Sequence, residues 1–203
     1  MDVSVANWAA WRPPDVARLL AGVDVPWYVA GGWALDLFLG AARREHQDLE
    51  IAVPNARFGE VAEALGDFDL FVITGPNEAE PLASASGRLA ETHQTWARER
   101  ATGKWRFDVF REPSEDGVWV CRRDASLRMP YAEVVERTAD GIPYGRPEVV
   151  LLFKAKRAEE AKNADDFEAV LPRLDAQRRA WLRGALDRVH PGHAWLVALD
   201  AHS

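Results

Sequence analysis

The chain has 203 residues, of which 48% are hydrophobic and 28% are charged, a globular rather than a disordered composition. Its 25 basic and 32 acidic side chains give a formal charge of −7, which argues against a protein that mainly binds nucleic acid, because such proteins usually present a basic face. The single cysteine, Cys121, excludes an internal disulfide framework and a multi-cysteine zinc site. We expect no signal peptide, no membrane span and a cytoplasmic location.

In the first 145 residues, short β-like runs broken by glycine and proline alternate with helical patterns. The expected strands cover residues 27–30, 49–53, 68–73, 104–111 and 117–122. The expected helices cover residues 14–20, 33–39 and 58–65. Residues 74–103 read as partly loop-like. After Pro147 the sequence is helical, and Pro172 and Pro191 divide it into three or four helices. We therefore predict an α/β domain over residues 1–145, followed by a helical region over residues 146–203.

The segment 27–53 reads as a strand, a double-glycine turn, a helix, a basic loop and a second strand. Gly31 and Gly32 lack a Cβ atom, so the backbone can turn sharply and come close to a ligand. Amides at the start of the following helix are suited to holding a phosphate. A plain turn between a strand and a helix explains the same two glycines, because the spacing is that of neither a dinucleotide-binding motif nor a P-loop.

Two acids accompany the second of these strands. Asp48 and Glu50 lie two positions apart, so on a strand both carboxylates leave the same face, while Leu49 and Ile51 point into the core. Carboxylates side by side repel one another, and a cation between them removes that cost. Oxygen ligands at this spacing suit Mg²⁺, which takes one or two carboxylates together with substrate phosphates. The alternative is a solvated face on an edge strand.

A third acid, Asp108, falls in the middle of the run 104–111, on the same face as Lys104, Arg106 and Phe110. If this strand lies beside residues 49–53, three carboxylates converge. Such a set is typical of metal-dependent phosphoryl or nucleotidyl transfer, in which metals hold the phosphates and the third acid helps to activate the attacking hydroxyl. The alternative is an ordinary ion pair between Asp108 and a neighbouring cation such as Arg106.

The glycine turn, the strand with two acids and the later strand with a third acid resemble the minimal nucleotidyltransferase superfamily. Within it, the segments GGWALDLFLG and REHQDLEIAV look most like those of bacterial aminoglycoside 2''-adenylyltransferases and lincosamide nucleotidyltransferases. The helical segment LLFKAKRAEEAKNADDFEAVLP is similar to a lysine-bearing region of the same group. The resemblance spans roughly residues 26–199 and implies an α/β (α+β) fold, a nucleotidyltransferase-like mixed sheet flanked by helices with a C-terminal helical region.

The resemblance also implies roles for individual residues. Asp48 and Glu50 would bind Mg²⁺, and Asp108 would be a metal ligand or general base. Gly31 and Gly32 would meet the nucleoside triphosphate, with Arg44 and Lys154 as further phosphate contacts. For Lys154 the alternative is an ordinary exposed lysine. Trp33 and Trp105 are candidates for stacking on a base or sugar.

The sequence departs from the superfamily pattern in three places. Trp33 follows the glycines where serine is common, so phosphate contacts have to come from backbone amides, Arg43, Arg44 or Lys154. The second acid is Glu50 rather than aspartate, and one further carbon–carbon bond moves its carboxylate by about 1.5 Å. A lysine–aspartate pair of the family is replaced by Lys162-Asn163.

The function implied is Mg²⁺-dependent transfer of AMP from ATP to a hydroxyl of a small acceptor, and the acidic balance permits a polycationic acceptor such as an aminoglycoside. Two alternatives stay open. One is the same chemistry on a protein or tRNA, although nucleic acid is disfavoured by the charge. The other is a non-catalytic nucleotide-binding relative. Carboxylates neutralised by Arg43, Arg44 or Arg106 would favour the binding protein, and clustered carboxylates beside an open cleft would favour catalysis.

Overall fold

The fold is built around a mixed β-sheet, as seen in a computed structural model that describes residues 7–76 and 78–201. Within these residues the sheet has eight strands in the order β10-β11-β1-β2-β6-β5-β3-β4. Their bounds are β1 (Tyr28–Val29), β2 (Glu50–Pro54), β3 (Phe68–Gly75), β4 (Glu78–Pro81), β5 (Gln94–Glu99), β6 (Trp105–Glu112), β10 (Val135–Arg137) and β11 (Pro143–Gly145). The pairs β1–β11 and β2–β6 are parallel, and the others are antiparallel. A smaller antiparallel sheet consists of β7 (Ser114–Glu115), β8 (Val118–Val120) and β9 (Arg128–Pro130).

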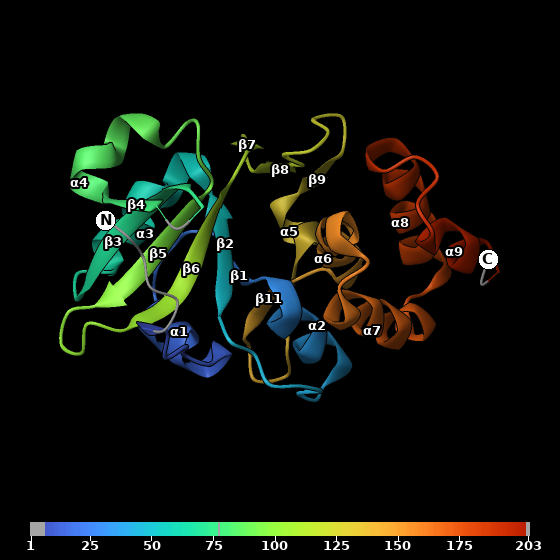
Figure 1. Cartoon of the computed structure of the whole chain (residues 1–203), viewed down its shortest axis with the longest axis horizontal. Coiled ribbons are helices and arrows are strands. Elements are labelled where there is room, and N and C mark those ends of the chain that lie inside the picture. The colour runs from blue at the N-terminus through green and yellow to red at the C-terminus, as the bar shows by residue number, and fades with distance from the viewer. Residues whose placement is uncertain (1–6, 77, 202–203) are drawn as a thin grey trace.

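Helices lie around the sheet, and a group of helices lies beyond one end of it (Figure 1). The helices are α1 (Pro13–Leu19), α2 (Gly31–Leu39), α3 (Phe58–Ala64), α4 (Leu82–Ala85), α5 (Tyr131–Val134), α6 (Pro147–Lys154), α7 (Ala161–Val170), α8 (Ala176–Val189) and α9 (Trp195–Ala201). The last four follow one another at the end opposite β3 and β4, with α6 and α7 beside α2 (Figure 1). In the described residues no helix combines the length and apolar character needed to span a membrane.

One core joins the sheet to the C-terminal helices. Val29 and Ile51 from the sheet, Leu151 from α6 and Leu182 from α8 are fully buried and belong to the same apolar cluster. Burial of this kind is the main favourable term in folding, so the helical end is attached through shared apolar contacts. The division into domains at residues 145 and 146 stays a prediction.

The mixed α/β fold predicted from the sequence is confirmed. The five expected strands correspond to β1, β2, β3, β6 and β8, and the helices after Pro147 are four in the described residues. The stretch 74–103 is more ordered than expected, because it contains β4, α4 and β5. In β5 the buried positions are Thr95 and Ala97, and Gln94, Trp96 and Arg98 alternate with them, so the strand carries little apolar signal. Pairing with β3 and β6 on either side makes it a strand.

Candidate active site

The second and third acids lie on neighbouring parallel strands. Glu50, the first residue of β2, pairs in register with Asp108 in the middle of β6. Paired residues of adjacent strands share a face of the sheet, so the two carboxylates leave the same side. The condition set by the sequence, that the Asp108 strand lie beside residues 49–53, is therefore met. Asp48 lies two residues before Glu50, in the exposed segment that leads into β2.

Burial and mutual repulsion raise the pKa values of both strand acids. Desolvation, followed by the charge of Asp48, raises the pKa of Glu50 to about 7, although Lys154 and Lys162 act in the opposite direction. Burial and then the charge of Glu50 hold the pKa of Asp108 well above its usual range, while the neighbouring Gln94 side chain lowers it. Perturbed carboxyl pKa values of this kind are common at functional sites.

Asp108 is only 4% exposed and accepts a 2.7 Å hydrogen bond from Nε2 of Gln94 at its Oδ2 atom. Its Oδ1 atom is buried without a hydrogen-bond partner in the described part of the chain. A buried, unpartnered carboxylate oxygen is costly unless a cation or a proton donor reaches it. Oδ1 of Asp108 is therefore a buried carboxylate oxygen whose hydrogen-bonding capacity is unused in the described residues.

The double-glycine turn lies directly against Glu50. Gly31 opens α2 with a φ of +58°, and a Cβ atom built there would lie 1.6 Å from Oε2 of Glu50. At Gly32 a Cβ atom would lie 2.4 Å from a guanidinium nitrogen of Arg44 and 2.7 Å from the His46 ring. A Cβ atom at either position would therefore displace a neighbouring side chain, and Gly31 in addition has a left-handed backbone that favours glycine.

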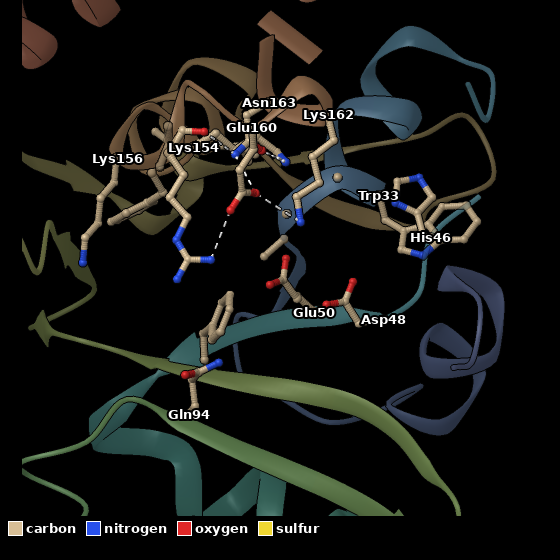
Figure 2. A pocket seen from close by; sticks show the side chains of 18 of the residues that line it. Trp33, His46, Asp48, Glu50, Gln94, Lys154, Lys156, Glu160, Lys162 and Asn163 are labelled. Carbon is tan, nitrogen blue, oxygen red and sulfur yellow. Dashed lines mark hydrogen bonds and ion pairs between the residues drawn. The ribbon is translucent and has the colours of Figure 1, made fainter. Parts of the chain in front are cut away.

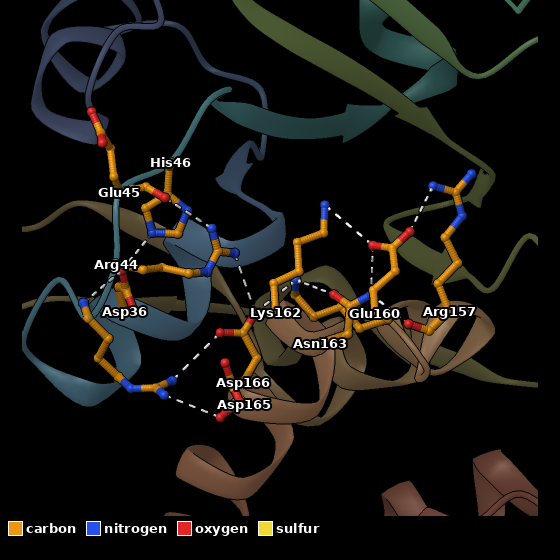
Figure 3. Close-up of polar contacts among 12 residues, drawn as sticks. Asp36, Arg44, Glu45, His46, Arg157, Glu160, Lys162, Asn163, Asp165 and Asp166 are labelled. Carbon is orange, nitrogen blue, oxygen red and sulfur yellow. Dashed lines mark hydrogen bonds and ion pairs between the residues drawn. The ribbon is translucent and has the colours of Figure 1, made fainter.

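Arginines near the three carboxylates are paired with other acids. Arg43 and Arg44 lie 3.6 Å and 3.5 Å from the buried Asp166 of α7 (Figure 3). Arg106 forms a 2.7 Å ion pair with Glu99. Among the described residues, Asp48 and Glu50 form no ion pair. In that part of the chain, none of Arg43, Arg44 and Arg106 neutralises these carboxylates. The described residues therefore lack the arrangement expected of a non-catalytic binding protein.

Lys154 is not the ordinary exposed lysine considered as an alternative, because its side chain is mostly buried and lines the hollow beside Glu50. Its Nζ lies 2.9 Å from Oδ2 of Asp166 and donates a 3.0 Å hydrogen bond to Oδ1 of Asn163. The lysine–asparagine departure seen in the sequence thus places Asn163 as a partner of Lys154. Lys162, to which the sequence pattern assigned no role, extends from α7 toward Glu50, and its Nζ lies 3.4 Å from Oε2 of Glu160 (Figure 2).

Two hollows meet at the carboxylates. The first, of about 590 Å³, is called here the cationic chamber. The basic side chains that line it are Arg44, Arg122, Arg123, Lys154, Lys156, Arg157 and Lys162. The acids that line it, within the described residues, are Glu45, Asp48, Glu50, Glu112 and Glu160. Gly31 and Gly32 also border the chamber, together with Arg44 and Lys154, whereas Arg43 does not line it.

The second hollow is a larger open groove of about 1510 Å³, called here the tryptophan groove. Four half-buried indoles line it: Trp8, Trp11, Trp33 and Trp96. Asp48, Glu50 and Gln94 line both hollows, whereas Asp108 lines the groove but not the chamber. Trp33, a candidate for stacking on a base or sugar, stacks on the His46 ring in this structure, with ring centroids 4.3 Å apart (Figure 2). Trp105 is 3% exposed and packs against Phe71 and Trp96, away from both hollows.

A family profile and curated relatives match parts of this chain in sequence. The family profile described as aminoglycoside-2''-adenylyltransferase matches residues 14–95, which include the glycine turn, Asp48 and Glu50. A 2''-aminoglycoside nucleotidyltransferase from Escherichia coli is 37% identical over 57 residues, 25% of this chain and 32% of that protein. One from Klebsiella pneumoniae is 29% identical over 89 residues, 42% of this chain and 50% of that protein. The chain is nucleotidyltransferase-like.

Solved structures extend this likeness to the whole fold. The antibiotic-resistance factor ANT(2'')-Ia in solution has a TM-score of 0.52 at 18% identity, covering 94% of this chain and 95% of its own. The lincomycin-bound lincosamide antibiotic adenylyltransferase LnuA has a TM-score of 0.51 at 18% identity, covering 76% and 90%. The resemblance to aminoglycoside nucleotidyltransferases is confirmed in sequence and in fold, and the resemblance to a lincosamide nucleotidyltransferase in fold alone. The nucleotidyltransferase-like chain spans about a third to a half of the curated relatives that it matches in sequence.

Proposed function

We propose that this chain transfers AMP from ATP to a hydroxyl group of a small acceptor, in a reaction that depends on Mg²⁺. The observation that carries the proposal is the pairing of Glu50 with Asp108 across β2 and β6, beside Asp48 and without a neutralising arginine among the described residues. The sequence relatives are named for aminoglycosides and one structural neighbour binds lincomycin, which supports a small antibiotic-like acceptor.

The residues present fit a magnesium ion that is shared with phosphate. Asp48 and Glu50 would hold it, and Asp108 has a buried oxygen, Oδ1, without a partner in the described residues. In the described part of the chain no three acidic, histidine or cysteine side chains are close enough to hold a metal by themselves, so phosphate oxygens would complete the coordination. Bound Mg²⁺ would offset the negative charge that builds up on the phosphates during transfer.

The chamber side chains would hold the triphosphate. Lys154 and Arg44 pair with Asp166 and also line the chamber, so their charges contribute to the field that the triphosphate would meet. Lys162 is 58% exposed at its side chain, and Arg122 lies 4.0 Å from Glu112. We assign the direct phosphate contacts to Lys162 and Arg122, together with the backbone at Gly31 and Gly32.

Asp108 would take the proton. In the transfer the acceptor oxygen forms a bond to the α-phosphorus, the bond from that phosphorus to the pyrophosphate oxygen breaks, and the hydroxyl proton passes to the Asp108 carboxylate. Pyrophosphate leaves with the electron pair and is held by the cations of the chamber. Burial raises the pKa of Asp108, so its carboxylate takes up a proton more readily than a solvated aspartate does, which suits this task.

The test is mass spectrometry of an aminoglycoside and lincosamide panel after incubation with ATP, Mg²⁺ and the protein. We expect one compound to gain one AMP with the unaltered chain, and no product with Asp48→Asn. Asp67→Asn, an exposed acid outside both hollows, is the matched control and should retain activity. Nucleotide binding is measured with Mn²⁺ in place of Mg²⁺. If the unaltered chain does not bind Mn²⁺·ATP, the proposal is contradicted.

A further inference from the structure

Asp166, on α7, draws together three cations from two other segments of the chain. Its side chain is only 3% exposed. From its carboxylate, Nζ of Lys154 is 2.9 Å away, and guanidinium nitrogens of Arg44 and Arg43 are 3.5 Å and 3.6 Å away. Lys154 ends α6, whereas the two arginines belong to the segment between α2 and β2, from which Arg44 reaches Asp166 in Figure 3. One buried carboxylate therefore joins three parts of the fold around the cationic chamber.

Asp166 stands behind these cations as seen from the chamber. Lys154 and Arg44 line the chamber, whereas Asp166 borders neither hollow. Three positive charges around one negative charge leave the cluster with a net charge of +2, so the cations still present a positive field to a phosphate. The acid therefore holds its cations without cancelling their charge.

Lys154 is held more firmly than Lys162, which lines the same chamber. Nζ of Lys154 also donates a 3.0 Å hydrogen bond to Oδ1 of Asn163, and the Lys154 side chain is 12% exposed. Lys162 is 58% exposed and pairs with Glu160, which is itself partly exposed. A lysine side chain that is ordered by folding loses little further conformational entropy when a ligand binds, which favours binding. The anchor on Asp166 thus prepares Lys154 for an anion in the chamber.

Without its charge, Asp166 would no longer keep the three cations together. All three reach the same carboxylate, so they lie close to one another, and like charges at this range repel. They would separate toward solvent, where a charge acts more weakly on a phosphate in the chamber because water screens it. Two chamber cations would lose their place while one acid behind them is removed, so the loss outweighs the gain in positive field.

From these observations we infer that Asp166 is a positioning residue for the nucleotide. It holds Lys154 and Arg44 at the chamber wall, so that their charges face the triphosphate, and it does not touch the nucleotide itself. The inference rests on the proposed function, because it takes the chamber as the triphosphate site. It gives α7 a part in nucleotide binding that is independent of the exposed Lys162.

Substitution of Asp166 tests the inference without knowledge of the acceptor. Asp166→Asn keeps the size of the side chain and removes its charge. We expect the dissociation constant of Mn²⁺·ATP, measured by calorimetry, to rise about tenfold, the scale of one lost charged contact. A purely electrostatic role gives the opposite result, since removal of a negative charge near an anion site strengthens anion binding.

Glu148→Gln is the matched control for stability. Glu148, on α6, is fully buried and lies 2.6 Å from Nε of Arg146 and 3.8 Å from a guanidinium nitrogen of Arg178. It borders neither hollow. Both substitutions leave buried cations without a counter-charge, so both should lower the urea midpoint of unfolding. Only Asp166→Asn should weaken Mn²⁺·ATP binding, whereas the Glu148 variant should stay within about twofold of the unaltered chain.

A double-mutant cycle shows whether Asp166 acts through its cations. Lys154→Met keeps a long apolar side chain and removes the nearest charge. In the Lys154→Met chain, the further change Asp166→Asn should alter the Mn²⁺·ATP dissociation constant by less than about threefold, because the nearest cation that the acid holds is already gone. Independent roles would give the same loss of about tenfold in both backgrounds.

The outcomes separate this inference from the proposed function. The inference is overturned if Asp166→Asn binds Mn²⁺·ATP as tightly as the unaltered chain or more tightly. It is equally overturned if Glu148→Gln weakens binding to the same extent, or if the two changes in the cycle are additive. Each of these results leaves nucleotidyl transfer in place, because the unaltered chain still binds Mn²⁺·ATP. If the unaltered chain does not bind it, the proposed function and the inference both fail.

Discussion

Nε2 of His46 lies 2.6 Å from Oδ2 of Asp36, and both side chains are only 3% exposed. The pair ties the loop that precedes β2 to helix α2 (Figure 3), and the Trp33 ring stacks on His46 (Figure 2). Asp36 also accepts a 3.3 Å hydrogen bond from the backbone of Arg43. Because His46 precedes Asp48 by two residues, this contact fixes the backbone that presents the first carboxylate.

Breaking this contact should weaken metal–nucleotide binding. We expect Asp36→Ala to lower affinity for Mn²⁺·ATP by about tenfold and the free energy of unfolding by about 1–3 kcal/mol, since the buried His46 loses its partner. Titration of Mn²⁺·ATP and chemical denaturation measure the two effects. Asp187→Ala, an exposed acid on α8, is the control. An Asp36 variant that is destabilised yet binds Mn²⁺·ATP normally would assign the pair to stability alone.

Gly31→Ala should abolish activity through Glu50. The added methyl group would displace the Glu50 carboxylate, since its ideal position is 1.6 Å from Oε2. We expect at least about a hundredfold loss of AMP transfer and about 1–2 kcal/mol of destabilisation from the left-handed backbone.

Gly40→Ala is a closely matched control for this change. Gly40 ends α2 with a φ of +78° and has open space around it, so alanine there incurs the backbone cost without displacing a neighbour. We expect thermal melting to show comparable losses of stability in the two variants. Kinetic assays should show loss of activity only in the Gly31 variant. Equal activity in the two variants would show that the position of Glu50 is unimportant.

The two lysines of the chamber should respond differently to substitution. Lys154→Met leaves the buried Asp166 without its nearest cation, so the unfolding free energy should fall by about 3 kcal/mol. Lys162→Met removes an exposed ion pair with Glu160, and stability should change by less than about 0.5 kcal/mol. The KM for ATP should rise about tenfold in the Lys162 variant, the usual scale for one charge-assisted phosphate contact. Urea unfolding and steady-state kinetics test the contrast, and a Lys154 variant as stable as the unaltered chain would contradict it.

His93 should make stability fall in mildly acidic solution. Burial, followed by the positive charges of Arg122 and Arg111, lowers the pKa of His93 to about 4. The unfolded chain binds a proton at a pKa near 6.5 and the folded chain does not, so the stabilisation is present above about pH 6.5 and is lost as pH falls toward 4.

The His93 effect should reach about 1 kcal/mol per pH unit inside that window. His93→Gln should remove this part of the pH dependence, as measured by urea unfolding across that window and into neutral solution. Parallel curves for the two proteins would show that His93 titrates normally in the folded chain.

By itself the sequence determined the local elements and the chemical character of the acids. Period-two runs predicted β2 and β6, and the Asp48–Glu50 spacing placed two carboxylates on one face, because strand geometry alone fixes which side chains alternate. The same local rules missed β5, whose alternating residues are mostly polar and whose strand forms only between its two neighbours.

Only the tertiary structure decided which charges remain available at the candidate site. Asp166 comes from α7, far along the chain from Asp48, and it pairs with Lys154 and Arg44, whereas Lys162 extends toward Glu50 and pairs with Glu160 (Figure 2). The separation into a cationic chamber and a tryptophan groove likewise depends on how α7 and the N-terminal segment pack around the start of β2. Contacts between distant segments depend on the burial of the whole core, which no local pattern contains.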